Sequence, residues 1–248
     1  MTYDDADLLL QRQDIAIFEV PTSTTPSDKA TLLKLQALVK QGAPTYTFLE
    51  IGSYRGGALL PHLVDRACSK VISVDKRPPA TPDNRGFHLG YEGITTQDMR
   101  NMITPHVPTD ALRKLITFDA DVSEVTRDMI GNAVDLAFID GEHTNVACFA
   151  DFVGLYPLLS DDGIIAFHDA NLVLDALFNI RTFLKFIGVS YAFHLLPELM
   201  ASIALGKNIA LLREAFDPIA YEEESYVRRA KRELHEQIAG SVSVGAHL

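Results

Sequence analysis

Runs of apolar residues alternate with segments of helical character along most of this chain. Five runs cover residues 46–51, 71–74, 115–118, 134–139 and 163–167. They are continuously apolar rather than alternating in polarity, which is typical of parallel strands buried on both faces. The helical segments between them would cover those two faces. The pattern therefore predicts an α/β fold.

The segments at the two ends of the chain are predicted to be helical. Residues 1–43 are interpreted as a lead-in, with one helix capped by Ser27 and ended by Gly42. Residues 44–213 would form the main domain. Residues 214–248 would form a helical tail, since apolar side chains recur there on one helical face between oppositely charged i,i+4 pairs.

The region after the fifth apolar run predicts the edge of the sheet. Residues 171–187 are expected to form a helix that ends at a glycine. Residues 190–196 and 201–212 are then predicted as two further strands, the second broken at residues 206–208. A short turn of this kind is typical of an antiparallel hairpin. The sequence thus predicts seven strands, mostly parallel, with a terminal antiparallel hairpin and helices on both faces.

Acidic residues stand at or within one residue of the end of each of the five runs. They are Glu50, Asp75, Asp119, Asp140 and Asp169. The carboxyl ends of parallel strands meet at one edge of the sheet, where open α/β folds bind their ligands. A fold does not require acids there, whereas a site for a polyhydroxylated, partly cationic ligand or for a metal ion would use them.

Composition narrows the class of protein. The chain has 248 residues, of which 47% are hydrophobic, enough for one large domain. A net charge of −11 argues against a nucleic-acid partner. The acidic N-terminus is unlike a signal peptide, and no run of 18 apolar residues predicts a membrane span. Cys68 and Cys148, both placed in predicted helices, favour neither a disulfide framework nor a cysteine zinc site. A cytoplasmic location is expected.

The first run leads into a glycine turn at residues 47–60. Gly52 and Gly56 permit positive φ and close approach of a ligand, and the following helix would direct its N-terminus at that ligand. The spacing differs from the G-x-G-x-x-G of dinucleotide-binding proteins. Instead, Glu-x-Gly-x-Tyr-x-Gly, which begins at Glu50, resembles motif I of class I S-adenosylmethionine-dependent methyltransferases, in the variant found in catechol-type O-methyltransferases.

Residues 134–145 and 156–169 extend this resemblance. The first contains Asp-Leu-x-Phe-Ile-Asp-Gly-x-His, and the second runs from Pro-Leu-Leu to an apolar strand that ends in His-Asp. Together they resemble the family that includes catechol-type O-methyltransferases and the O-methyltransferases of macrolide sugars. The resemblance covers roughly residues 45–213. It implies a seven-stranded Rossmann-like fold and methyl transfer from S-adenosylmethionine, usually to an oxygen.

Several residues are predicted to bind the cofactor. Asp75 stands where an acid accepts hydrogen bonds from a ribose diol, and the resemblance places Ala120-Asp121 in the loop that flanks adenine. Asp121 and Ser123 could instead serve as helix caps. The full predicted set is Glu50, Gly52, Ser53, Tyr54, Gly56, Asp75, Ala120, Asp121 and Asp140.

The resemblance also implies a metal site and a general base. In the metal-dependent relatives, carboxylates at two adjacent strand ends hold a divalent cation that binds the substrate hydroxyls. Asp140 and Asp169 match those ligand positions, and His143 matches the general base of the sugar-modifying relatives. A pKa near neutrality suits histidine to that task.

The third metal ligand departs from the family pattern. Ala170 replaces the Asn of the catechol-type enzymes, and His168 replaces an acid of the sugar-modifying ones. Adjacent strand residues point to opposite faces, so His168 can bind a metal beside Asp169 only if the strand has already ended. In that case a histidine ligand shifts the preference from Mg²⁺ toward Mn²⁺, Fe²⁺ or Zn²⁺.

The sequence leaves several alternatives open. An NAD-type oxidoreductase and a non-catalytic small-molecule-binding module with the same fold compete with the methyltransferase, and methyl transfer without a metal is a further variant. Asp140 and Asp169 could serve as caps and cofactor contacts only. Residues 76–97, rich in Pro and Gly, form either a lid over the substrate or a surface insertion. The expected partner is a small hydroxylated molecule, and a homo-oligomer is left open.

Overall fold

The computed structural model describes residues 1–91 and 93–245. Seven strands form one sheet in the order β5-β2-β1-β6-β7-β9-β8. All neighbours are parallel except β9, which is antiparallel to both β7 and β8. The predicted fold is therefore confirmed. The strands are β1 (Tyr46–Ile51), β2 (Cys68–Val74), β5 (Leu115–Phe118), β6 (Val134–Ile139), β7 (Leu159–Phe167), β8 (Tyr191–Leu195) and β9 (Ala201–Leu205).

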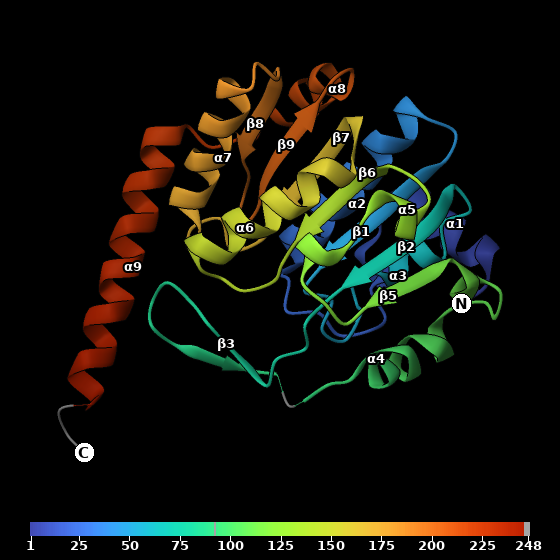
Figure 1. Ribbon diagram of the computed structural model, residues 1–248, viewed down its shortest axis with the longest axis horizontal. Coiled ribbons are helices and arrows are strands. Elements are labelled where there is room, and N and C mark those ends of the chain that lie inside the picture. The colour runs from blue at the N-terminus through green and yellow to red at the C-terminus, as the bar shows by residue number, and fades with distance from the viewer. Residues whose placement is uncertain (92, 246–248) are drawn as a thin grey trace.

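Helices cover both faces of this sheet, as Figure 1 shows. The α-helices are α1 (Tyr3–Arg12), α2 (Pro26–Gly42), α3 (Leu60–Leu63), α4 (Thr96–Ile103), α5 (Arg127–Ile130), α6 (Asn145–Leu155), α7 (Leu174–Phe186), α8 (Asn208–Phe216) and α9 (Glu223–Gly245). Single 3₁₀ turns are η1 (Ile15–Ile17), η2 (Thr104–His106), η3 (Ala111–Lys114), η4 (Val122–Glu124) and η5 (Tyr156–Leu158).

The sheet separates two hydrophobic cores because successive strand residues point to opposite faces. On β1, Phe48 packs with apolar residues of α1, α2, α3 and α8. Its neighbour Leu49 packs on the other side with residues of α5, α6, α7 and α9. Burial on both faces explains why the central strands are continuously apolar in the sequence.

The order of the strands fixes where a ligand can bind. From β1 the chain moves outward through β2 to β5, and it then returns to β6 on the other side of β1. The switch point therefore lies between β1 and β6, and in open α/β sheets ligands bind outside the carboxyl ends of the strands at this point. Gly52 follows β1 and Asp140 follows β6, so both flank the switch point.

Four local predictions were wrong. The terminal hairpin joins β8 to β9 through residues 196–200, and residues 206–208 instead lead into α8. The apolar residues after Asn208 have helical rather than strand periodicity, a distinction that short runs do not reveal. Thr25, not Ser27, caps α2. Cys68 begins β2 rather than lying in a helix.

Residues 76–97 contain ordered structure rather than one irregular insertion. β3 (Ala80–Pro82) and β4 (His88–Gly90) pair as a small antiparallel hairpin. Figure 1 shows this hairpin beyond the edge of the main sheet, in the direction in which α9 extends. Arg85 of the hairpin donates to Gln237 of α9 at 3.3 Å. Among the described residues, no helix has the length and apolar character needed to cross a membrane.

Candidate active site

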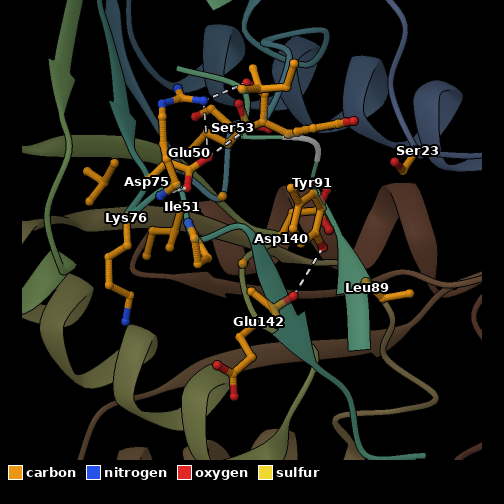
Figure 2. A pocket seen from close by; sticks show the side chains of 18 of the residues that line it. Ser23, Glu50, Ile51, Ser53, Asp75, Lys76, Leu89, Tyr91, Asp140 and Glu142 are labelled. Carbon is orange, nitrogen blue, oxygen red and sulfur yellow. Dashed lines mark hydrogen bonds and ion pairs between the residues drawn. The ribbon is translucent and has the colours of Figure 1, made fainter. Parts of the chain in front are cut away.

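A cavity of about 600 Å³ opens at the carboxyl ends of the central strands. Figure 2 shows acids from the ends of three strands around it. Glu50 is the fifth residue of β1, Asp75 follows β2, and Asp140 follows β6. Tyr91 and Leu89, from the hairpin region, lie across from them. The hairpin thus forms one wall of the cavity, which supports its interpretation as a lid.

The glycine turn also lines this cavity. Gly52 has a φ of +86°, and a β-carbon there would overlap the main chain of Asp140 and Gly141. Tyr54 is also in the left-handed region, at +45°. Its amide donates to the Asp75 carboxylate at 2.9 Å, and the amide of Arg77 donates to the other oxygen at 2.8 Å. An ionised carboxylate has about four acceptor positions, so Asp75 is oriented and keeps capacity for a diol.

Two polar atoms beside the turn have no partner. Glu50 Oε2 and Ser53 Oγ are buried, and neither forms a hydrogen bond within the described part of the chain. Burial, and then the negative charge of Asp140, raise the pKa of Glu50 well above its ordinary value. A buried carboxyl group without a partner is costly, and a cationic ligand in the cavity would favour its charged form. These atoms suit the ammonium or sulfonium of S-adenosylmethionine.

Ala120 and Asp121 also line this cavity. Asp121 accepts a hydrogen bond from Lys76 at 2.8 Å, and it also caps η4 through the amide of Ser123 at 3.0 Å. These bonds, led by the one from Lys76, lower its pKa to about 2. The capping role that the sequence left as an alternative is therefore present, in a residue that also lines the cavity.

A second group of residues meets at the ends of β6 and β7. Asp140, His143, His168 and Asp169 each bring one donor atom within 4.8 Å of the others. β7 ends at Phe167, and Asp169 has a φ of +48°. The strand has thus ended before His168, which satisfies the condition for His168 and Asp169 to face one centre.

The charges in this group are paired closely. His143 Nδ1 lies 2.9 Å from Asp169 Oδ2, and His168 Nδ1 lies 3.0 Å from Asp140 Oδ1. Burial opposes the charged imidazolium of His143, but the nearby carboxylates of Asp140 and Asp169 raise its pKa to about 9. Burial likewise disfavours the ionised form of Asp169, but the hydrogen bond from His143 and the nearby charge of His168 lower its pKa. Two positive charges therefore balance two carboxylates here.

The donor set fits a divalent metal ion. His168 Nδ1 is buried and forms no regular hydrogen bond despite its short distance to Asp140. Two carboxylates and two imidazoles are ligands that suit Mn²⁺, Fe²⁺ or Zn²⁺ better than Mg²⁺. The imidazolium charges occupy the position that a dication would take.

The structure adds residues that the sequence interpretation missed. Asp28 of α2 is buried against His168, at 3.3 Å from Nε2. The main chain of Asn84, in the hairpin, donates to the carbonyl of His143 at 3.1 Å. Asp151 of α6 lines the cavity and is almost buried. Conversely, the strand-end acid Asp119 is 60% exposed and does not line this cavity.

Among these residues, only Asp28 has a local signal in the sequence, and that signal concerns its position in the first turn of a helix. Thr25-Pro-Ser-Asp28 is a capping-box pattern. Contacts such as Asp28 with His168, between residues 140 positions apart, leave no signal in the spacing of a single sequence.

Comparisons with known proteins find a similar domain and similar folds. The model of a methyltransferase domain matches residues 49–170. The fold is similar to that of CalS11, a calicheamicin methyltransferase, at 16% identity and a TM-score of 0.55, covering 81% of this chain and 93% of that one. It is also similar to the O-methyltransferase NovP, at 12% identity and a TM-score of 0.59, covering 82% and 98%. No curated protein sequence matches significantly.

Proposed function

We propose that this chain, whose residues 49–170 match a methyltransferase domain, is a class I methyltransferase that transfers the methyl group of S-adenosylmethionine to a hydroxyl group of a small molecule, a sugar or a natural product. The matched methyltransferase domain argues against the alternative of an NAD-type oxidoreductase. The observation that carries the proposal is the group of Asp140, His143, His168 and Asp169, which adjoins the cofactor cavity. A hydroxyl group, unlike an amine, must lose a proton as it attacks, and this group of residues can accept one.

The glycine turn and the strand-end acids hold the methyl donor in this proposal. Gly52 lets the chain approach the ligand closely, and Asp75 accepts from the ribose hydroxyls. Glu50 and Ser53 face the cationic end of the donor. Ala120 and Asp121 flank the base. Fixing the donor in this way holds the methyl carbon in one position for the attacking oxygen.

Asp140, His168 and Asp169 are the proposed metal ligands. Their support is the unbonded Nδ1 of buried His168 and the two carboxylates beside it. A bound dication would orient the acceptor hydroxyl and lower the cost of deprotonating it. The donor set favours Mn²⁺ over Mg²⁺ in this role.

His143 is the proposed general base. Its ring lines the cavity, and Asp169 orients it through Nδ1 at 2.9 Å. Its other nitrogen, Nε2, lies 3.6 Å from Asp140 Oδ1, too far for a regular hydrogen bond. With a dication bound in place of the imidazolium charges, His143 would be neutral with its proton on Nδ1, and Nε2 would take the proton of the acceptor hydroxyl.

The choice of a small acceptor rests on the cavity and on the related structures. The hairpin residues Thr81, Leu89 and Tyr91 close one side of the cavity, which suits a small molecule. Of the similar structures, one is described as a calicheamicin methyltransferase and one as an O-methyltransferase. At 12–16% identity they bear on the fold, and they support the acceptor class only as a proposal.

Thermal unfolding with added ligands tests the proposal. S-adenosylmethionine, S-adenosylhomocysteine and NAD⁺ are added in turn, each with EDTA, Mg²⁺ or Mn²⁺. A ligand at 100 times its dissociation constant adds about 2.7 kcal/mol, or roughly 5–10 °C in the midpoint. We expect a shift with the sulfonium and its product and a further shift with Mn²⁺.

Turnover completes the test. S-adenosylhomocysteine should form when hydroxylated sugars or phenolic compounds are supplied, and EDTA should suppress it. A shift with NAD⁺ alone would contradict the methyltransferase assignment. Binding of S-adenosylmethionine without turnover on any acceptor would favour the non-catalytic binding module.

A further inference from the structure

Asp28 is a buried carboxylate in the first turn of α2, in the N-terminal part of the chain. Its side chain has no exposed surface. Within the described residues, no Lys or Arg is in ion-pair distance of it, and its charged partner is His168, with Nε2 at 3.3 Å from Oδ2. Burying a carboxylate without a partner costs free energy. The buried position of Asp28 beside His168 therefore requires an explanation.

Capping of α2 does not provide that explanation. Asp28 accepts from the amide of Thr25 at 2.9 Å, as the N3 residue of a capping box. Asp5 of α1 and Asp98 of α4 make the same reciprocal bonds with Thr2 and Thr95, and both do so at the surface. The cap therefore does not need a buried carboxylate.

The contact with His168 determines which ring nitrogen faces the site. Because Asp28 accepts the proton of Nε2, the lone pair of a neutral His168 is on Nδ1. Nδ1 is the nitrogen that lies 3.0 Å from Asp140 Oδ1 and 3.3 Å from Asp169 Oδ2. The backbone amide of Leu199 donates to the other oxygen of Asp28 at 3.4 Å, which steadies the carboxylate from the loop between β8 and β9.

We propose that Asp28 is a positioning residue that holds His168 with Nε2 protonated, so that Nδ1 is presented as a metal ligand. Metal-binding histidines commonly donate their second ring N–H to a carboxylate, and loss of that carboxylate weakens metal binding by 10- to 100-fold. The inference rests on the proposed metal site. It also places part of that site in α2, outside the matched domain of residues 49–170.

Metal titration of the full chain with Asp28→Asn provides the test. The asparagine keeps one side-chain oxygen, which can accept from the Thr25 amide, but it lacks the second oxygen that accepts from the Leu199 amide and the charge that holds the Nε2 proton. We expect Mn²⁺, measured by calorimetry, to bind 10- to 100-fold more weakly. S-adenosylhomocysteine should bind within twofold of wild type. Asp98→Asn is the matched control, because it alters a capping box without a histidine partner, and its Mn²⁺ affinity should equal that of wild type.

A second measurement uses wild-type protein, so it does not depend on whether a substitution at Asp28 changes the folding of α2. In wild-type protein loaded with Zn²⁺, nitrogen NMR of the histidine rings should find the metal on Nδ1 of His168 and the proton on Nε2, with His168→Gln identifying the signal. Metal on Nε2, or unchanged Mn²⁺ affinity in Asp28→Asn, overturns the inference and leaves the metal site standing. Wild-type protein that binds neither ion overturns the metal site and the inference together.

Discussion

The α-carbon of Gly52 lies against the main-chain carbonyl of Asp140, with no space for a side chain between them. The contact joins the cofactor turn after β1 to the strand end that carries a proposed metal ligand. Hydrogen bonds continue the sheet at this point, since the amide of Asp140 donates to Ile51 at 2.9 Å. The site for the methyl donor and the acidic centre are therefore adjacent because two parallel strands are adjacent.

Replacing Gly52 by Ala should remove cofactor binding and destabilise the fold. The left-handed backbone costs a residue with a β-carbon roughly 1–2 kcal/mol, and the overlap with Asp140 forces the two strand ends apart. We expect a loss of about 2 kcal/mol or more in urea unfolding and no measurable binding of S-adenosylhomocysteine in calorimetry.

Gly86→Ala is the matched control for that variant. Gly86 has a similar φ of +81°, but no atom lies within 4 Å of a β-carbon there. The Gly86→Ala variant should lose only the stability that the left-handed backbone costs a residue with a β-carbon, and it should bind the cofactor as wild type does. Equal cofactor affinity in the two alanine variants would show that the contact with Asp140 is unimportant.

The sequence was sufficient to predict the sheet and the residues at its carboxyl edge. The continuous apolar runs follow directly from burial on both faces, and acids at the strand ends stand out against them. Glu50, Asp75 and Asp140 do line the cavity, as expected from the meeting of parallel strand ends. Asp119 shows the limit of this rule, because it follows β5 at the sheet edge and turns to solvent.

Contacts between distant segments could not be predicted in this way. The hairpin of β3 and β4 has three-residue strands within a Pro- and Gly-rich segment, too short to show a periodic pattern. The left-handed backbone at Asp169 directs its side chain toward the same centre as the side chain of His168. From the sequence we could say only that this requires the strand to end before His168. Asp28 meets His168 only because α2 packs across β6 and β7.

Asp140→Asn should abolish turnover and spare the fold. The amide keeps the shape of the side chain but removes one of the two negative charges that His143 and His168 face. We expect the rate of S-adenosylhomocysteine formation to fall by at least ~10²-fold. Asp119→Asn removes a strand-end acid outside the cavity and should leave the rate unchanged. Full activity in Asp140→Asn would place the reaction elsewhere.

His143→Gln distinguishes a general base from a metal ligand. If His143 is the base, the rate should fall by roughly 10²–10⁴-fold while Mn²⁺ affinity changes little. His88→Gln, at an exposed histidine of the hairpin, is the control. A tenfold or greater loss of Mn²⁺ affinity in His143→Gln would instead make His143 a fourth ligand, which its position within the donor group also allows.

The stability of the ligand-free chain should decrease as pH rises because of Asp151. No hydrogen bond or ion pair of this side chain is found within the described residues, and burial raises its pKa to about 7. The unfolded chain loses this proton near pH 4. Between about pH 4 and pH 7 the folded state therefore holds more protons, and stability decreases as pH rises.

Asp151→Asn should remove that dependence. Each pKa unit corresponds to about 1.4 kcal/mol, so between pH 5 and pH 7 the variant should gain up to about 3 kcal/mol relative to wild type. Urea unfolding at the two pH values measures the difference. Asp128→Asn, which alters an exposed carboxyl group of α5, should leave it unchanged. Parallel pH profiles for wild type and Asp151→Asn would mean that the buried carboxyl group is ionised in the folded chain, held by a partner such as Lys76, whose charge already opposes the shift.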